Sequence, residues 1–330
     1  MMNSLDRTRS FIAGIPVDRP PFHPIIMRFA AQYAGFGYRD FCLDPHTKCE
    51  AMIRCADELG LDWVTTMSDP YTEGDAFGLQ IEYPENDLPK SLLLLLPDLE
   101  DLEMLRVPEM SQSFRQMNRI REVEEFSKRV GDRLFIVGWI EGPMAMLAVL
   151  RGLTNACIDL LTEQEKVEKL LDIVIQNSIN FITAQVEAGA HCIGMGDAAC
   201  SQIGPDLYER FFFERERMLV DHIHSLGALA KLHICGDTTA ILPQMILTGA
   251  DIVDVDHLVR DMAPFAKLLG KNQVLCGNAD PVSVVLEGDE TLIRKTVQRC
   301  YTEGGGRVIT SAGCEITPET PVKNLLAMMR

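Results

Sequence analysis

Short apolar runs rich in β-forming residues alternate with amphipathic helical stretches along most of this chain, and this alternation restricts the fold more than any other feature. The runs lie at 62–67, 134–140, 192–196, 228–234, 251–256, 273–278 and 307–312. Helical periodicity fills the intervals, for example at 163–189 and 205–227, and both of these stretches end in glycine. Strands that alternate with helices form a parallel sheet with right-handed crossovers.

The number of these units favours a closed barrel over an open sheet. At least seven βα units follow one another without a break, which predicts a (β/α)8 TIM barrel. A doubly wound sheet is the alternative, but no G-x-G-x-x-G motif follows a first strand, so the usual dinucleotide-binding arrangement is not indicated. The 330 residues contain no long repeat and no low-complexity linker. We therefore expect a single barrel domain over 1–330, with an N-terminal extension and a surface excursion around 82–110.

The charge of the chain limits its partners. A formal net charge of −17 argues against nucleic acid and against anionic membrane surfaces. The longest apolar run, at 92–96, is far too short to cross a bilayer, and the first residues lack the apolar core of a signal peptide. We expect a cytoplasmic protein with reduced thiols, in which a cysteine in a polar setting binds metal or reacts rather than forming a disulfide.

Residues that can bind metal or exchange protons stand at or just after the ends of most expected strands. They are Asp69, Glu141, Asp197, His233 with Cys235, Asp256 with His257, Asn278 with Asp280, and Cys314 with Glu315. The active site of a (β/α)8 barrel lies at the C-terminal ends of its strands, so we expect these side chains to face one cavity. Helix capping is the alternative explanation for aspartate and asparagine at such positions.

One histidine and two cysteines among these residues match a zinc site. His233 and Cys235 are two residues apart in an extended segment, so their side chains point to the same side. Cys314 closes the last strand, which lies beside the first in a closed barrel. Catalytic zinc takes three such ligands and keeps a fourth position open, and thiolates favour zinc over magnesium or calcium. A lone H-x-C pair is a weak signal, and the second cysteine at another strand end strengthens it.

Several longer motifs carry a resemblance to a known family. "HICGDTTAIL" (233–242), "CGNADP" (276–281) and "SAGCEITPETPVKNL" (311–325) resemble the uroporphyrinogen decarboxylase superfamily. Within it they are most similar to the zinc-dependent methylcobamide:coenzyme M methyltransferase branch, which transfers methyl groups with corrinoids. The resemblance covers most of the chain and implies a distorted (β/α)8 barrel.

The two branches of this family differ in the residues they need. The decarboxylases are metal-free and bind a macrocycle with eight carboxylates through an arginine-rich N-terminal segment. Arg28 is present here, but Gln32 stands where a second family arginine is expected, while Asp69 matches the central aspartate of the decarboxylases. Only the methyltransferases use the trio His233, Cys235 and Cys314, and in them the trio holds zinc. The trio therefore decides in favour of the methyltransferase branch.

The resemblance implies a zinc-dependent methyltransferase that moves a methyl group between a corrinoid, such as methylcobalamin, and a small thiol or another methyl acceptor or donor. Zinc lowers the pKa of a bound thiol, and the thiolate can then attack the methyl group of a methyl–cobalt(III) corrinoid. In the reverse direction, zinc as a Lewis acid activates a methylated small molecule. The chain has no corrinoid-binding signature of its own, so we expect the corrinoid on a separate carrier protein or as a free cobamide.

The remaining strand-end residues receive provisional roles. The candidate catalytic residues are Asp69, Glu141, Asp197 and Asp256, and the candidate cofactor contacts are Arg28 and Asn278. We expect one of Glu141, Asp197 and Asp256 to be the fourth zinc ligand and the others to orient the substrate or the ligand histidine. Two alternatives stay open: a metal-free uroporphyrinogen decarboxylase, and a catalytically silent protein that binds a cobamide or a methylated ligand.

Overall fold

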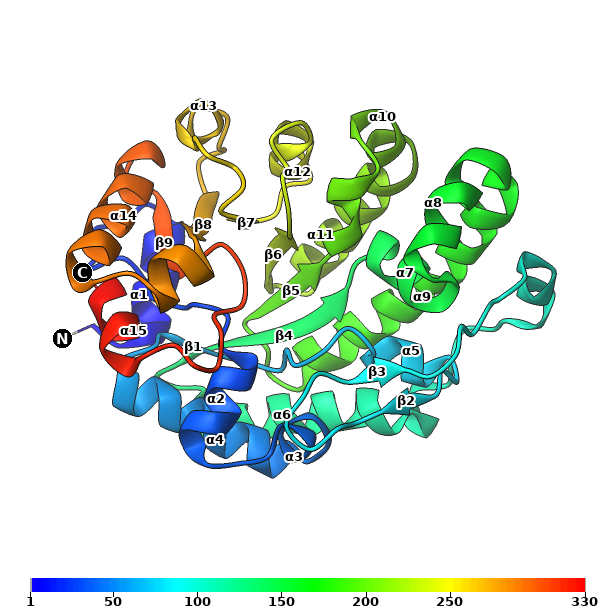
Figure 1. Cartoon of the computed structure of the whole chain (residues 1–330), viewed down its shortest axis with the longest axis horizontal. Coiled ribbons are helices and arrows are strands. Elements are labelled where there is room, and N and C mark those ends of the chain that lie inside the picture. Colours follow the sequence, from blue (N-terminus) through cyan, green and yellow to red (C-terminus); the bar gives the residue numbers. More distant parts are fainter. Residues whose placement is uncertain (1, 330) are drawn as a thin grey trace.

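A parallel sheet forms the centre of the computed structural model, which describes residues 2–329. Within these residues the sheet has seven strands in the order β1-β4-β5-β6-β7-β8-β9, with helices around its outer side (Figure 1). The strands are β1 (Trp63–Thr65), β4 (Phe135–Glu141), β5 (Cys192–Gly196), β6 (Leu229–Ile234), β7 (Ile252–Val255), β8 (Val274–Ala279) and β9 (Val308–Ala312). All seven predicted runs are therefore confirmed as strands, and every neighbouring pair in the sheet is parallel.

A short segment around Phe22 joins the two edges of this sheet. The Phe22 carbonyl accepts a hydrogen bond from Asp62 N (2.9 Å) beside β1. On the other side, His23 N donates to the Thr310 carbonyl (3.0 Å) and Thr310 N donates to the Pro21 carbonyl (2.9 Å) on β9. The fold is thus a distorted (β/α)8 barrel, in which an irregular stave that the sequence pattern did not predict completes the ring.

Helices lie on the outside of the barrel. They are α4 (Pro45–Leu59), α6 (Phe114–Val130), α9 (Gln164–Glu187), α11 (Glu214–Ser225), α12 (Leu242–Leu247), α13 (Ala263–Ala266), α14 (Glu290–Glu303) and α15 (Val322–Met328). All of them except the last, α15, connect consecutive staves of the ring. Side-chain caps begin several of them, since Asp44 accepts from Thr47 N and Asp289 accepts from Leu292 N. The helix expected at 205–227 is interrupted, because a π-helical turn, η4 (Glu209–Phe213), separates α10 (Pro205–Tyr208) from α11.

Further elements lie at the ends of the barrel and in the connections that leave the strands. They are α1 (Ser4–Ile12), α2 (Met27–Ala34), α3 (Tyr38–Leu43), α5 (Thr72–Ala76), α7 (Pro143–Arg151), α8 (Leu153–Thr162), η3 (Ala198–Gln202) and η5 (Pro281–Leu286). The segment predicted as an excursion contains an antiparallel pair, β2 (Ile81–Glu82) with β3 (Lys90–Ser91), followed by η1 (Leu99–Met104) and η2 (Met110–Gln112). The division into one domain with an N-terminal extension and this excursion stays a prediction.

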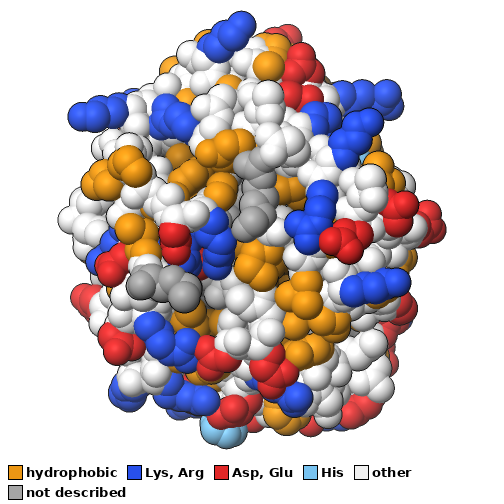
Figure 2. Space-filling view, turned by 90° about the vertical axis from the view of Figure 1, so that its left-hand side faces the viewer, with side chains coloured by type: hydrophobic (Ala, Val, Ile, Leu, Met, Phe, Trp, Pro, Cys, Tyr) orange, Lys and Arg blue, Asp and Glu red, His pale blue; other side chains and the backbone are white. Residues whose placement is uncertain are grey.

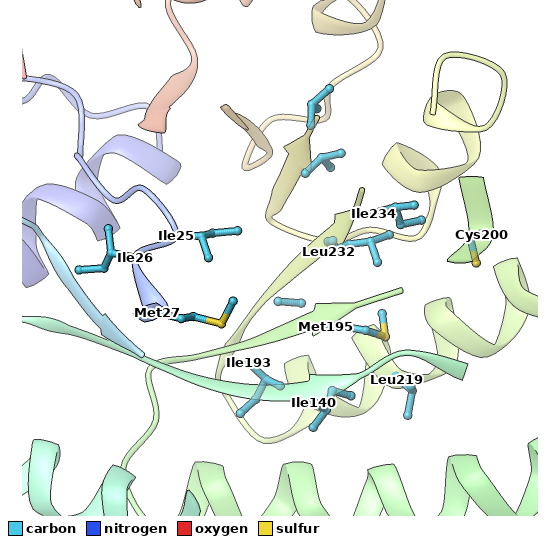
Figure 3. Close-up of a cluster of buried hydrophobic side chains, with 14 of the residues drawn as sticks. Ile25, Ile26, Met27, Ile140, Ile193, Met195, Cys200, Leu219, Leu232 and Ile234 are labelled. Carbon is cyan, nitrogen blue, oxygen red and sulfur yellow. The ribbon is translucent and has the colours of Figure 1, made fainter. Parts of the chain in front are cut away.

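Apolar side chains alternate between the two faces of the sheet, as the period of two in a strand requires. Ile140 and Ile193 point from β4 and β5 toward the surrounding helices, where they join the large core cluster (Figure 3). Residues on the opposite face, among them Trp63, Phe135 and Cys276, fill the inside of the barrel together with side chains of α1. The polar residues described below lie above this inner layer.

The charges on one face of the molecule and the apolar character of its helices bear on the surroundings in which it acts. Acidic and basic side chains are interspersed on the face that carries both termini, with apolar side chains between them (Figure 2). Within residues 2–329, no single helix has the length and apolar composition needed to cross a membrane. Helices α7 and α8 meet that test only as a pair bent by 109°.

Candidate metal centre

The three residues predicted to bind zinc meet at the C-terminal mouth of the barrel. His233 is the second-last residue of β6, Cys235 directly follows that strand, and Cys314 follows β9. Strands β7 and β8 lie between β6 and β9 in the sheet, so the two thiols approach each other across the mouth of the barrel. The Cys235 Sγ lies 2.9 Å from His233 Nε2 and 3.4 Å from Cys314 Sγ. All three candidate ligand atoms are within 4.8 Å of one another.

Glycines allow the loops that carry these ligands to approach one another. A β-carbon at Gly313 would collide with the backbone nitrogen of His257, so only glycine lets the loop before Cys314 pass so close to the loop after β7. Gly236 follows Cys235 with φ = +95°, a left-handed conformation that favours glycine. Gly313 and Gly236 therefore provide the backbone geometry that brings the candidate ligands together.

The electrostatics of the trio favour a thiolate beside a protonated imidazole ring when no metal is bound. Burial disfavours the charged form of His233, but Asp254 and Cys314 outweigh burial and raise its pKa to about 9. A hydrogen bond from Cys235, with help from His233, lowers the pKa of Cys314 to about 5. The same hydrogen bond raises the pKa of Cys235, so Cys314 is the thiol of this pair that more readily forms the thiolate that coordinates metal.

The donor set fits zinc. Two sulfurs and one imidazole nitrogen are the ligands of catalytic zinc sites, and the separations of 2.9 and 3.4 Å are within the span of two zinc–ligand bonds of about 2.0–2.3 Å. The second ring nitrogen of the histidine also has the usual partner: His233 Nδ1 lies 3.2 Å from Asp254 Oδ2. A zinc ion would therefore find three ligands and an oriented imidazole at this place.

Asp256 lies beside the trio, as predicted, but its oxygens are already bound. Its Oδ2 accepts from Gly236 N (3.0 Å), the residue next to Cys235, and its Oδ1 accepts from Leu258 N (3.0 Å). His257 Nδ1 is 2.8 Å from the same Oδ1. Asp256 thus fastens the loop that carries Cys235 to the end of β7, which is a positioning task and not the catalytic one expected for it.

Asp197 lies in a buried group separate from the metal trio, and the catalytic role expected for it stays a prediction. Its side chain is fully buried, and Oδ1 accepts from Ala145 N (2.6 Å) at the start of α7. Asp197, Cys200 and Glu216 form a separate buried group, in which Tyr208 OH donates to Glu216. Burial raises the pKa of Asp197 to about 6 and that of Glu216 well above its usual value. The residue serves the packing of α7 against η3 and α11.

Asp69 is held in a buried ion pair. Its Oδ2 lies 2.6 Å from Arg115 Nη2 and 3.5 Å from Arg119 Nη2, and Ser68 Oγ also donates to it. The side chains of Asp69 and Arg115 have exposed fractions of 0% and 1%. Arginines of α6 neutralise the charge of Asp69, which gives it a structural role, and the catalytic role expected for it stays a prediction.

Asp69→Asn is expected to destabilise the protein while leaving the metal centre intact. Removing one partner of a buried ion pair leaves Arg115 uncompensated, which costs about 3–5 kcal/mol of unfolding free energy. Asp57→Asn, which breaks the exposed pair with Arg133, is the matched control and should cost at most about 1 kcal/mol. Denaturant unfolding measures both. Loss of activity in Asp69→Asn without loss of stability would restore the catalytic role.

Glu141 ends β4 at the mouth and is the carboxylate with the most unusual surroundings. Trp139 Nε1 donates to its Oε1 (2.9 Å), and its backbone N donates to Glu73 Oε1 (2.8 Å). The Trp139 ring lies where β-carbons at Gly194 and Gly196 would be, so two glycines of β5 give it room. Burial, together with Glu73, raises the pKa of Glu141 well above its usual value. Glu141 is thus a buried acid at the mouth.

Asn278 has no free groups with which to contact a cofactor. Its Nδ2 donates to the carbonyls of Val259 (2.6 Å) and Asp256 (3.3 Å), and its Oδ1 accepts from Cys300 Sγ (3.3 Å) on α14. The side chain is buried between β8 and the helix layer, so the expected cofactor contact is replaced by a role in fixing the loop after β7. Asp280 caps η5, as the alternative explanation foresaw.

Arg28 lines a cavity near the last metal ligand. Its backbone N donates to Glu315 Oε1 (3.1 Å), and Glu315 is next to Cys314. The cavity has a volume of about 460 Å³ and lies between Arg28, Gln32 and Tyr38 on one side and the loop at 318–319 on the other. This places the Arg28 side chain, which is 28% exposed and has its Nε 3.5 Å from Glu315 Oε1, at the wall of a space large enough for a small molecule. The predicted contact of Arg28 with a cofactor stays a prediction.

Comparison with known proteins now identifies the family. The model of the uroporphyrinogen decarboxylase (URO-D) family matches residues 3–330. The chain belongs to the uroporphyrinogen decarboxylase family. Among solved structures, a methyltransferase from Methanosarcina mazei superimposes with a TM-score of 0.89 at 24% identity, covering 99% of this chain and 97% of that one. This likeness confirms the predicted fold.

Relatives of both kinds occur within the uroporphyrinogen decarboxylase family. The chain is 28% identical to the methylcobamide:CoM methyltransferase MtbA of Methanosarcina mazei over 297 residues, covering 88% of this chain and 86% of the relative. It is 27% identical to MtaA of Methanosarcina barkeri, covering 98% and 95%. It is also 24% identical to the uroporphyrinogen decarboxylase of Geobacter metallireducens, covering 96% and 94%.

Sequence reasoning missed several residues that build this family member's site. Asp254, behind His233, and Lys231, two residues before it, both lie within strands and not at strand ends. Arg115 and Arg119, which neutralise Asp69, lie on a helix. The sequence did contain a signal for Lys231 and Asp254, because a lysine and an aspartate inside otherwise apolar strands need a partner when they are buried. Nothing in the helix pattern marked the arginines.

Proposed function

We propose that this protein is a zinc-dependent methyltransferase that moves a methyl group between a corrinoid and a small thiol or other methyl acceptor or donor. The observation that carries the proposal is the meeting of His233, Cys235 and Cys314 at the barrel mouth. The names of the relatives MtbA and MtaA, which act on methylcobamide and CoM, support it. The fold and the donor set agree with the same activity.

The protein's own residues prepare the site for this chemistry. His233 would offer Nε2, and Cys235 and Cys314 their sulfurs, while Asp256 fixes the loop of Cys235 and Asp254 orients the imidazole. Zinc bound there would supply a Lewis acid that lowers the pKa of a substrate thiol. The cavity beside Arg28 would hold the rest of the thiol substrate, with the guanidinium facing an anionic group.

The transfer itself needs no further cofactor from this chain. In the proposed reaction the thiolate sulfur would attack the methyl carbon of a methyl–cobalt(III) corrinoid as substrate. The carbon–sulfur bond would form as the cobalt–carbon bond breaks, and the electron pair would stay on cobalt as cobalt(I). Glu141, whose pKa burial and Glu73 raise well above its usual value, ends β4 at the mouth where the substrates would meet. We propose that the corrinoid arrives on a separate carrier protein or as a free cobamide, and that the protein acts in the cytoplasm.

The test is methyl transfer from methylcobalamin to a thiol under anaerobic conditions. Zinc-loaded protein with methylcobalamin and coenzyme M, or another small thiol, is expected to convert the methylcobalamin spectrum to that of cobalt(I) and to yield the methyl thioether. Chelator-treated protein should be inactive and should recover when zinc is returned. A zinc-loaded protein that binds cobamide but turns over none of a panel of thiols or methylated donors would favour a binding protein instead.

A further inference from the structure

A lysine is buried inside the barrel directly beneath the candidate metal centre. Lys231 lies on β6, two residues before His233, so both side chains point to the inside of the barrel. Its side chain has an exposed fraction of 2%. The Nζ lies 5.9 Å from the centre of the Trp63 ring and 5.5 Å from that of Trp139, so aromatic faces cover the cation on two sides. A buried lysine of this kind needs a counter-charge.

The counter-charge is Asp254, and the same oxygen serves the metal-ligand histidine. Asp254 lies on β7 in register with His233 of β6. Its Oδ2 lies 2.6 Å from Lys231 Nζ and 3.2 Å from His233 Nδ1. The side chain of Asp254 has an exposed fraction of 1%. One carboxylate oxygen thus connects the buried lysine to the imidazole whose other nitrogen faces Cys235.

We propose that Lys231 is a positioning residue for the metal centre, acting through Asp254. The lysine holds the carboxylate by an ion pair, the carboxylate lies 3.2 Å from Nδ1 of His233, and this contact would keep Nε2 directed at the metal position. The inference rests on the zinc site of the proposed function. It goes further by assigning a role to a residue that is not a ligand and touches no substrate.

The charges of the group support the same assignment. A zinc ion with two thiolates and a neutral imidazole has no net charge, and Asp254 would make the buried assembly negative by one. Lys231 restores neutrality, because its Nζ lies 2.6 Å from Asp254 Oδ2. Without the lysine, a buried carboxylate beside two thiolates would have no counter-charge and one tether fewer, so it would hold the imidazole less firmly.

The structure contains a matched lysine with which to separate this role from simple stabilisation. Lys48 is fully buried on α4, and its Nζ lies 3.3 Å from Glu122 Oε2 of α6, outside the barrel. Both lysines are buried ion-pair partners, but only Lys231 is connected to a candidate metal ligand. Lys231→Met and Lys48→Met should therefore lose comparable stability but differ in metal binding.

The experiment measures zinc affinity by competition with a chromogenic chelator, with no corrinoid or thiol substrate present. Lys231→Met is expected to bind zinc about 10–100-fold more weakly than the wild type, and Lys48→Met within about 2-fold of it. The cobalt(II)-substituted proteins supply a second readout, since a mispositioned imidazole shifts the visible bands of Lys231→Met but not of Lys48→Met. Equal zinc affinities and spectra for the two variants would overturn the proposal.

Asp254→Asn and the double variant Lys231→Met/Asp254→Asn complete the design. If Lys231 acts through Asp254, adding Lys231→Met to Asp254→Asn should change zinc affinity by no more than about 2-fold. A further 10-fold loss would show that the lysine acts by another route and would overturn the proposal. The double variant also keeps the test valid if Lys231→Met alone does not fold, because it buries no unpaired charge. Wild-type protein that binds no zinc would reject the metal site itself, whereas zinc binding without methyl transfer would reject only the proposed function.

Discussion

Replacing Cys235 or Cys314 by alanine is expected to cause the largest loss of function in this protein. Each substitution removes one of the three candidate zinc ligands, and Cys235 also contacts both of the other two. We expect zinc affinity to fall by at least about 1000-fold, because each thiolate contributes several kcal/mol to binding. Methyl transfer should fall to the level of the chelator-treated protein, since the Lewis acid is then absent. Metal analysis after dialysis and the methylcobalamin assay measure the two effects.

Cys157→Ala is the control for these substitutions. Cys157 is a half-buried thiol on α8 and is not part of the metal-ligand group. It should keep its zinc and its activity, which would show that loss of a thiol as such is harmless. Cys314→Ala with a full complement of tightly bound zinc would contradict the ligand assignment.

Failure to decarboxylate uroporphyrinogen is the second large effect that we expect. The macrocycle carries eight carboxylates, and each needs a charge partner or a hydrogen-bond donor when it leaves water. The chain has a net charge of −17 and carries Gln32 where a second arginine is expected in the decarboxylases. Asp69, which matches the central aspartate of those enzymes, is bound by Arg115 and Arg119. The cavity thus has Arg28 without the second arginine expected in the decarboxylases, and Asp69 is already ion-paired.

The measurement is an anaerobic incubation with the porphyrinogen, followed by separation of the products by their number of carboxylates. The Geobacter metallireducens decarboxylase, which is similar to this chain along most of its length, is a suitable positive control. We expect no four-carboxylate product above background. Turnover comparable to that enzyme, unaffected by removal of zinc, would overturn the choice of branch and return Asp69 to a catalytic role.

The sequence was sufficient for the sheet and for the metal trio, because both follow from local periodicity. A parallel strand buried on both faces appears as a short apolar run, and seven such runs were found where strands lie. The C-terminal ends of parallel strands meet at one end of a barrel. Cys235, which follows the run at 228–234, and Cys314, which follows the run at 307–312, could therefore be expected to converge. The meeting of Cys235 and Cys314 confirms that reasoning.

The sequence was not sufficient where the role of a side chain depends on a distant partner. Asp69, Asp197 and Asn278 stand at strand ends as predicted, yet each is bound to groups on a helix or a loop that spacing along the chain does not reveal. The stave at Phe22 has a single bridging residue between prolines, so no run of residues marked it. Asp254 was passed over because it is in the middle of a strand, where its register with His233 is a property of the sheet.

X-ray absorption at the zinc edge, combined with metal quantification of the purified protein, tests the central claim most directly. We predict about one zinc per chain, with two sulfur ligands at ~2.3 Å and at least one imidazole nitrogen at ~2.0–2.1 Å. The sulfur contribution should drop by half in Cys314→Ala reconstituted at high zinc concentration. A purified protein that transfers methyl groups at full rate without metal, or a zinc spectrum without sulfur ligands, would contradict the account.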